Sequence, residues 1–171
     1  MRVLLVIPTF KYATNYPEFL SFSDFPVGFA YLASALKQAG HEVIGLNPNN
    51  IVGYVSAQVM LQDILTKKIK EVQPDLIGLG GLCTDYKFLK DAIEIIRKVD
   101  PKIPIVLGGQ IVTNDAEILD ILKPDYAIQG EGETQIVCLA ERLGQKNPPG
   151  RLMHSESHMT PLDDLPFPDY E

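Results

Sequence analysis

Short apolar runs recur along the chain and are separated by longer stretches of mixed character. Five such runs occupy residues 3–7, 42–46, 76–79, 105–107 and 126–128. Each is apolar at most consecutive positions, which is typical of strands buried on both faces of a parallel sheet. The pattern therefore predicts five parallel strands with helices covering both faces.

Helical periodicity marks the stretches between these runs, which span residues 26–40, 55–72, 85–99, 114–124 and 133–144. Pro26 stands at the start of the first and Gly40 at its end, as expected at helix boundaries. Asn114 is the expected cap of the fourth helix, with Glu117 three residues on, close to a capping box. Five βα units predict an α/β, doubly wound, five-stranded parallel sheet of flavodoxin-like (Rossmann-like) order 2-1-3-4-5.

Two segments interrupt this alternation. Residues 9–26 form a connection longer than usual and rich in Phe and Tyr, for which a self-packed loop and a ligand lid are both open. Residues 147–171 hold five of the thirteen prolines, a composition typical of an extended linker. We therefore expect one domain at residues 1–146, followed by a Pro-rich linker at 147–171.

Composition narrows the class of partner. Of the 171 residues, 46% are hydrophobic, as in ordinary globular domains. The net charge of -7 argues against nucleic acid or an anionic membrane surface as main partner. The apolar start is too short for a signal peptide or a membrane span, so we expect a cytoplasmic protein. Cys83 and Cys138 are too few for a disulfide framework or a cluster site.

Glycines follow three of the predicted strands. They stand at residues 80–81, 108–109, 130 and 132, on the sheet edge where this architecture binds ligands. Closely spaced glycines in three neighbouring loops indicate a low floor on which a large ligand lies against backbone amides.

The motifs of several common enzyme and cofactor-binding classes are absent from this edge. A phospho-receiver domain needs acidic residues after strand 1 and an Asp after strand 3, where this chain has Pro8 and Gly80. No G-x-G-x-x-G or Ser/Thr-rich phosphate loop follows strand 1. No Ser-His-acid or Cys-His set converges, because His41 opens strand 2 at the opposite edge. The sequence predicts no catalytic residue.

Other chemistry-bearing residues have structural interpretations. Glu131 and Glu133 suit a helix N-terminus as well as they suit catalysis. Cys83 is expected to be a small residue near the crevice, with no base beside it in sequence. His154 and His158 in "HSESH" lack a third ligand and a helical spacing, so no metal site is predicted.

Five segments in order carry a family resemblance: "PVGFAYLASALKQAGHEV", "PDLIGLGGLCTDY", "PIVLGGQIVT", "DYAIQGEGET" and "PLDDLPFPDY". Over nearly the whole chain they resemble the N-terminal cobalamin-binding domain of cobalamin-dependent radical S-adenosylmethionine enzymes. That group includes anaerobic magnesium-protoporphyrin IX monomethyl ester cyclase-like proteins and methylases.

The resemblance implies a flavodoxin-like domain in which the nucleotide tail of cobalamin enters a crevice at the strand ends and the corrin lies over them. The cofactor-binding residues that we expect are Pro8, Thr9, Gly80, Gly81, Leu82, Cys83, Thr84, Gly108, Gly109, Gln110, Gly130, Glu131, Gly132 and Glu133.

Two departures from the family pattern refine this expectation: the missing histidine, and a wider "GLGGLCT" segment with one extra residue, which leaves the roles of Cys83 and Thr84 open. The D-x-H-x-x-G motif that many cobalamin domains carry after strand 1 is absent, and Gln110 and Ile111 stand where relatives often have a His after Gly-Gly. The resemblance thus implies cobalamin held without a His lower ligand from this domain. The chain also lacks the C-x-x-x-C-x-x-C triplet, so the iron–sulfur cluster and S-adenosylmethionine are expected only in a separate domain in cis.

The predicted function is therefore a cobalamin-binding module without activity of its own, from a radical S-adenosylmethionine cyclase or methyltransferase. The alternatives are a nucleotide or nucleotide-sugar binding half-domain of a transferase, or an orphan interaction domain.

Overall fold

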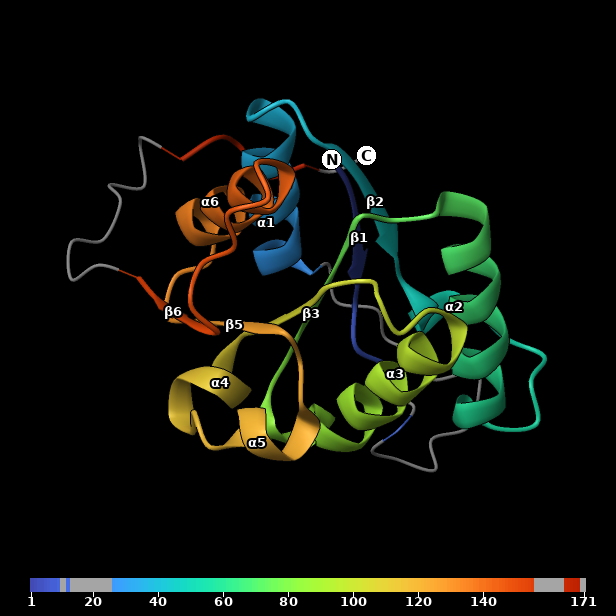
Figure 1. The fold of residues 1–171 in the computed structure, drawn as a ribbon. Helices are drawn as coiled ribbons and strands as arrows, with labels where there is room; N and C mark the ends of the chain where they lie inside the picture. Colours follow the sequence, from blue (N-terminus) through green and yellow to red (C-terminus); the bar gives the residue numbers. More distant parts are fainter. Residues whose placement is uncertain (10–11, 13–25, 156–164, 170–171) are drawn as a thin grey trace.

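Six parallel strands form a single sheet in the computed structural model, which describes residues 1–9, 12, 26–155 and 165–169 (Figure 1). The sheet order is β2-β1-β3-β4-β5-β6. The strands are β1 (Arg2–Val6), β2 (Glu42–Leu46), β3 (Leu76–Gly80), β4 (Ile105–Gly108), β5 (Tyr126–Gln129) and β6 (Leu152–His154). The α/β class and the order 2-1-3-4-5 are confirmed for the first five strands.

The predicted strand number was wrong by one. β6 pairs in parallel with β5, with Leu152 opposite Ala127 and His154 opposite Gln129. Only Leu152 and Met153 in this three-residue strand are apolar, which is too short a run for periodicity to detect. The strand lies inside the segment for which the proline content indicated a linker.

The helices cover the two faces of the sheet unequally. They are α1 (Val27–Gln38), α2 (Ala57–Val72), α3 (Tyr86–Val99), α4 (Gln110–Asn114), α5 (Ile118–Leu122) and α6 (Glu133–Gly144), with 3₁₀ turns η3 (Pro48–Asn50) and η4 (Cys83–Asp85). Helices α1 and α6 lie on one face, whereas α2, α3 and α5 cover the other (Figure 1).

The fourth predicted helix is two short helices. Asn114 ends α4 instead of capping a helix, because Asp115 is extended with φ of -152°. The Asp115 side chain accepts a hydrogen bond from the Glu117 N–H at 2.9 Å, which turns the chain before α5. The Asn and Asp residues thus mark the break between α4 and α5, and the second helix begins about one turn later than we predicted.

Alternation along the central strands separates two hydrophobic clusters. In β1, Leu4 and Val6 pack under α2 and α3, while Val3 and Leu5 pack under α1 and α6. At the sheet edge, β2 differs from the expectation of burial on both faces, since Glu42 and Gly45 are exposed.

Most of the aromatic segment 9–26 lies outside the described residues, so the choice between a self-packed loop and a lid is not tested there. Tyr12 is described, and its ring meets Phe88 of α3 edge-on, with centroids 5.5 Å apart. The pKa of the Tyr12 hydroxyl is raised, chiefly by burial and also by Asp91. Within the described part of the chain, no helix is both long and apolar enough to span a bilayer.

Candidate functional site

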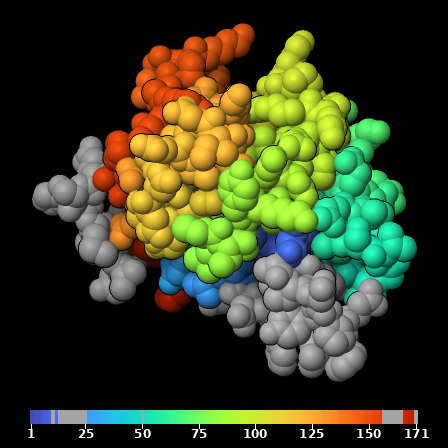
Figure 2. Space-filling model, turned by 90° about the horizontal axis from the view of Figure 1, so that it is seen from below, coloured from blue at the N-terminus to red at the C-terminus, as the bar shows by residue number. Residues whose placement is uncertain are grey.

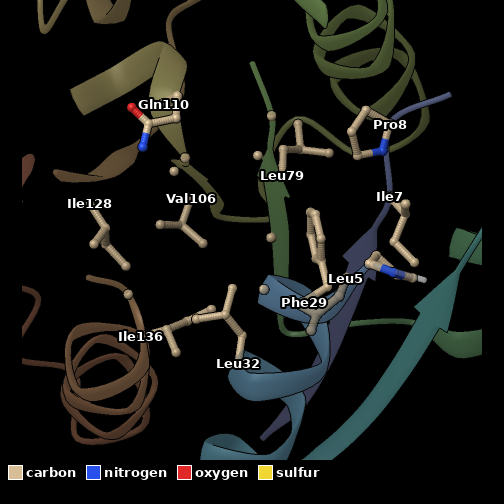
Figure 3. A pocket seen from close by; sticks show the side chains of 18 of the residues that line it. Leu5, Ile7, Pro8, Phe29, Leu32, Leu79, Val106, Gln110, Ile128 and Ile136 are labelled. Carbon is tan, nitrogen blue, oxygen red and sulfur yellow. The ribbon is translucent and has the colours of Figure 1, made fainter. Parts of the chain in front are cut away.

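A cavity of about 630 Å³ opens at the carboxyl edge of the sheet, on the face that α1 and α6 cover. Its apolar walls come from the sheet and from the helical layer of α1 and α6, and Figure 3 shows these side chains turned toward a common space. They are Leu5, Val106 and Ile128 from the sheet, Phe29 and Leu32 from α1, and Ile136 from α6. A mostly apolar cleft of this size is typical of a site for a small molecule or cofactor.

The glycine loops form the mouth of this cavity. Every predicted site residue lines it except Thr9, Cys83 and Thr84. Viewed from the carboxyl edge, α4 and the loop after β3 lie side by side (Figure 2), and the Ile111 N–H donates to the Gly81 carbonyl at 3.1 Å. The sequence prediction therefore selected residues from four separate loops that the fold brings together around one cavity.

Close backbone contacts require several of these glycines. A Cβ at Gly109, where φ is +84°, would stand 2.8 Å from both the backbone nitrogen and oxygen of Gly81. A Cβ at Gly80 would stand 3.2 Å from the Gly108 carbonyl oxygen. The glycines thus allow neighbouring loops to pack on one another, in addition to leaving the floor uncovered.

Three predicted residues do not line the cavity. Thr9 is buried, and Cys83 and Thr84 are exposed on the 3₁₀ turn η4, which directs the chain outward. Asp85 at the end of that turn lines the cavity instead, and its Oδ2 accepts a hydrogen bond from the Leu82 N–H at 2.8 Å.

Sequence reasoning missed the other residues that line the cavity, most of which belong to the strands and to α1. They are Leu5, Ile7, Pro26, Val27, Gly28, Phe29, Leu32, Asn49, Gly78, Leu79, Asp85, Val106, Ile128 and Ile136. The first turn of α1 was present in the "PVGF" motif, but its periodicity indicated only a core helix. The inward positions of β1, β4 and β5 could have been found from strand alternation.

Asn49 contributes a buried acceptor at the cavity wall. Its Nδ2 donates to the Pro8 carbonyl at 3.1 Å and to Asn47 Oδ1 at 2.9 Å. These two acceptors fix the amide orientation, since Asn47 Oδ1 also accepts from the Asn49 N–H. Asn49 Oδ1 is then left buried without a hydrogen-bond partner, which is costly unless a ligand or water supplies a donor.

Among the described residues, the charged side chains that line the cavity are all carboxylates: Asp85, Glu131 and Glu133. A polyphosphate at this mouth would face like charges and would find no lysine or arginine among the lining residues that the structure describes. This electrostatic character disfavours a nucleotide or nucleotide-sugar as the ligand.

Two of the three histidines are described, and neither lines the cavity. His41 lies at the opposite edge, where its Nδ1 is 3.3 Å from the Met1 amino nitrogen. His154 ends β6 and is exposed, one position beyond Met153, whose side chain packs toward α1 and α6. Alternation turns His154 toward the other face. His158 lies outside the described residues, and the described residues contain no His/Cys/Asp/Glu group that could hold a metal ion.

The profile of the B12 binding domain family matches residues 23–140, which include most of the cavity lining. The chain belongs to the B12 binding domain family.

Two curated relatives are longer than this chain. An uncharacterized protein of Methanocaldococcus jannaschii is 34% identical over 102 residues, covering 56% of this chain and 19% of the relative. The anaerobic magnesium-protoporphyrin IX monomethyl ester cyclase of Rubrivivax gelatinosus is 28% identical over 165 residues, covering 90% of this chain and 26% of the relative. The chain thus spans about a fifth and a quarter of the lengths of these proteins.

The residues at the site fit a corrinoid. Cobalamin presents a broad ring, many uncharged carboxamides and a nucleotide tail with a single phosphodiester. A floor of glycine loops can lie close to such a ring, the apolar cavity can receive a heterocyclic base, and Asn49 Oδ1 can accept from an N–H donor. Family membership and these features together support a cobalamin-binding module.

Proposed function

We propose that this chain binds cobalamin as the cofactor module of a larger radical S-adenosylmethionine enzyme. The observation that carries the proposal is the apolar cavity of about 630 Å³ that opens among the glycine loops, inside the region matched to the B12 binding domain family. No Ser/Thr-rich phosphate loop follows strand 1 in the sequence, and the described lining residues include no lysine or arginine, which favours this function over a nucleotide-binding one.

The lining residues divide into two groups by chemistry. The apolar walls between the sheet, α1 and α6 would hold the nucleotide tail, because burying its base there removes apolar surface from water. The loops at Gly80–Leu82, Gly108–Gln110 and Gly130–Glu133 would support the corrin, with backbone groups and Asn49 Oδ1 facing its carboxamides. Bound cobalamin supplies organometallic chemistry at cobalt, while this chain binds and orients it.

The proposal includes a cobalt without a His lower ligand from this domain. Gln110 lines the cavity directly after Gly109, where an imidazole from this chain could otherwise reach the ring. The opposite-edge position of His41 and the outward position of His154 support this reading.

The rest of the enzyme is proposed from the family resemblance and from the cyclase relative. We infer a radical S-adenosylmethionine domain in cis that holds the iron–sulfur cluster and S-adenosylmethionine, in a cytoplasmic cyclase or methyltransferase.

Because β6 lies past residue 146, the cobalamin-binding domain extends at least to His154. Asp169 meets α1, donating its N–H to the Ala30 carbonyl at 3.1 Å and pairing with Lys37.

The test is a binding measurement with a spectroscopic readout. The purified protein is mixed with hydroxocobalamin, desalted, and its visible spectrum is recorded at several pH values. The proposal predicts retained corrinoid absorbance without the features of His coordination. Failure to retain cobalamin would remove the module function, and a spectrum of His-ligated cobalt would contradict the lower-ligand proposal alone.

A further inference from the structure

The ladder between β4 and β5 ends before the carboxyl edge of the sheet. The paired residues are Val106 with Tyr126 and Leu107 with Ala127. By contrast, the ladder between β3 and β4 continues to Gly80 with Gly108. No pairing between β4 and β5 therefore links their following loops at the point where both border the cavity.

The Thr113 side chain joins these two loops. Its hydroxyl donates to the Gly109 carbonyl oxygen at 3.3 Å and accepts from the Gly130 N–H at 3.2 Å. The hydroxyl proton thus bonds one loop, and a lone pair of the same oxygen accepts from the other. A second link runs beside it, because Gln129 Nε2 donates to the Thr113 carbonyl at 3.2 Å.

Both glycines that the hydroxyl contacts have unusual backbone conformations. Gly109 has φ of +84° and Gly130 has φ of +89°. Loops in such conformations are freer to rearrange than regular strands, since glycine has many accessible states. A hydrogen-bonded group between them restricts that freedom without adding a side chain to the cavity, because Thr113 itself is not among the lining residues.

The same short helix also contacts the third glycine loop. The Ile111 N–H donates to the Gly81 carbonyl at 3.1 Å, so α4 touches the loops after β3, β4 and β5. Gln110, its first residue, lines the cavity. The helix therefore sets the positions of the loops that form the mouth.

We propose that Thr113 is a positioning residue that fixes the spacing of the Gly109 and Gly130 loops and thereby preorganises the mouth of the cavity for a corrinoid. This inference rests on the proposed cobalamin function. A site held in its binding geometry avoids the cost of ordering its loops when the ligand arrives.

The test compares three variants. Thr113→Val keeps the shape of the side chain and removes both hydrogen bonds, whereas Thr113→Ser keeps the hydroxyl. Thr66→Val is the matched control, because the Thr66 hydroxyl accepts from Gln62 Nε2 on α2, away from the cavity. Thr113→Ala replaces Thr113→Val if the valine variant does not fold.

Two measurements are made on each protein: the dissociation constant for hydroxocobalamin, and the exchange rate of the Gly130 amide proton in cobalamin-free protein. Thr113→Val should weaken cobalamin binding about tenfold and speed Gly130 exchange about fivefold, since one bridging group is lost. Thr113→Ser and Thr66→Val should match the unmodified protein in both.

The outcomes separate this inference from the proposed function. If the unmodified protein binds cobalamin and Thr113→Val binds it as tightly as Thr66→Val does, the positioning role is overturned. If the unmodified protein does not bind cobalamin, the proposed function fails. In that case an unchanged Gly130 exchange rate in Thr113→Val would show that the bridge does not hold the loops either.

Discussion

Gly109 packs directly on Gly81, so that a Cβ at Gly109 would stand 2.8 Å from two backbone atoms of Gly81. This contact joins the loops after β3 and β4 at the mouth of the cavity. It also explains why a glycine follows β4 directly. Gly108 continues the ladder opposite Gly80, and Gly109 adopts positive φ and makes the close approach.

Gly109→Ala should therefore destabilise the protein by roughly 1–3 kcal/mol, because strain at positive φ adds to a backbone clash. Gly45→Ala is the control, since a Cβ at Gly45 meets nothing within 4 Å. Urea unfolding measures both. Equal stability of the two variants would show that the Gly81 contact is easily relaxed.

Asp85 should hold the loop after β3 through its bond to the Leu82 N–H. Asp85→Ala is expected to weaken hydroxocobalamin binding about tenfold, since it frees Leu82 at the cavity mouth. Asp85→Asn keeps an oxygen acceptor and should lose less. A titration that gives the same affinity for Asp85→Ala as for the unmodified protein would remove this residue from the site.

His41 gives the stability a predictable pH dependence. The pKa of His41 is lowered, chiefly by burial and then by the N-terminal amino group, with Glu141 acting in the opposite direction. The unfolded chain therefore takes up a proton more readily, and stability should fall as the pH drops below about 6.5.

The measurement is urea unfolding of the unmodified protein and of His41→Gln at pH 8 and pH 5. The unmodified protein should lose more stability over this interval than His41→Gln does. A parallel loss in both would mean that another group titrates.

The sequence predicted the first five strands and the glycine mouth because both depend on local signals. Apolar runs report burial on two faces, and glycines directly after strands must lie at the carboxyl edge. β6 was missed for the opposite reason. Leu152 and Met153 are held in the sheet by pairing with β5, a long-range contact that a three-residue run does not encode.

The cavity walls were harder to predict than its mouth. Phe29, Leu32 and Ile136 have the spacing of ordinary core residues, and the space between them depends on how α1 and α6 sit on the sheet. Asn49 gave no sequence signal either, because its unpaired oxygen follows from its contacts with Pro8 and Asn47.

Equilibrium dialysis of hydroxocobalamin against the unmodified protein and two glycine variants shows whether cobalamin binds in this cavity. Gly28 lines the cavity in the first turn of α1, and a Cβ there meets nothing within 4 Å. Gly28→Leu should fill the mouth while favouring the helix by roughly 0.5–1 kcal/mol. Gly45→Leu places the same side chain in open space on β2, away from the cavity.

We predict that the unmodified protein and Gly45→Leu each retain one cobalamin per chain, and that Gly28→Leu folds but retains none. Equal retention by all three proteins would place cobalamin elsewhere, and no retention by the unmodified protein would show that this domain does not bind cobalamin.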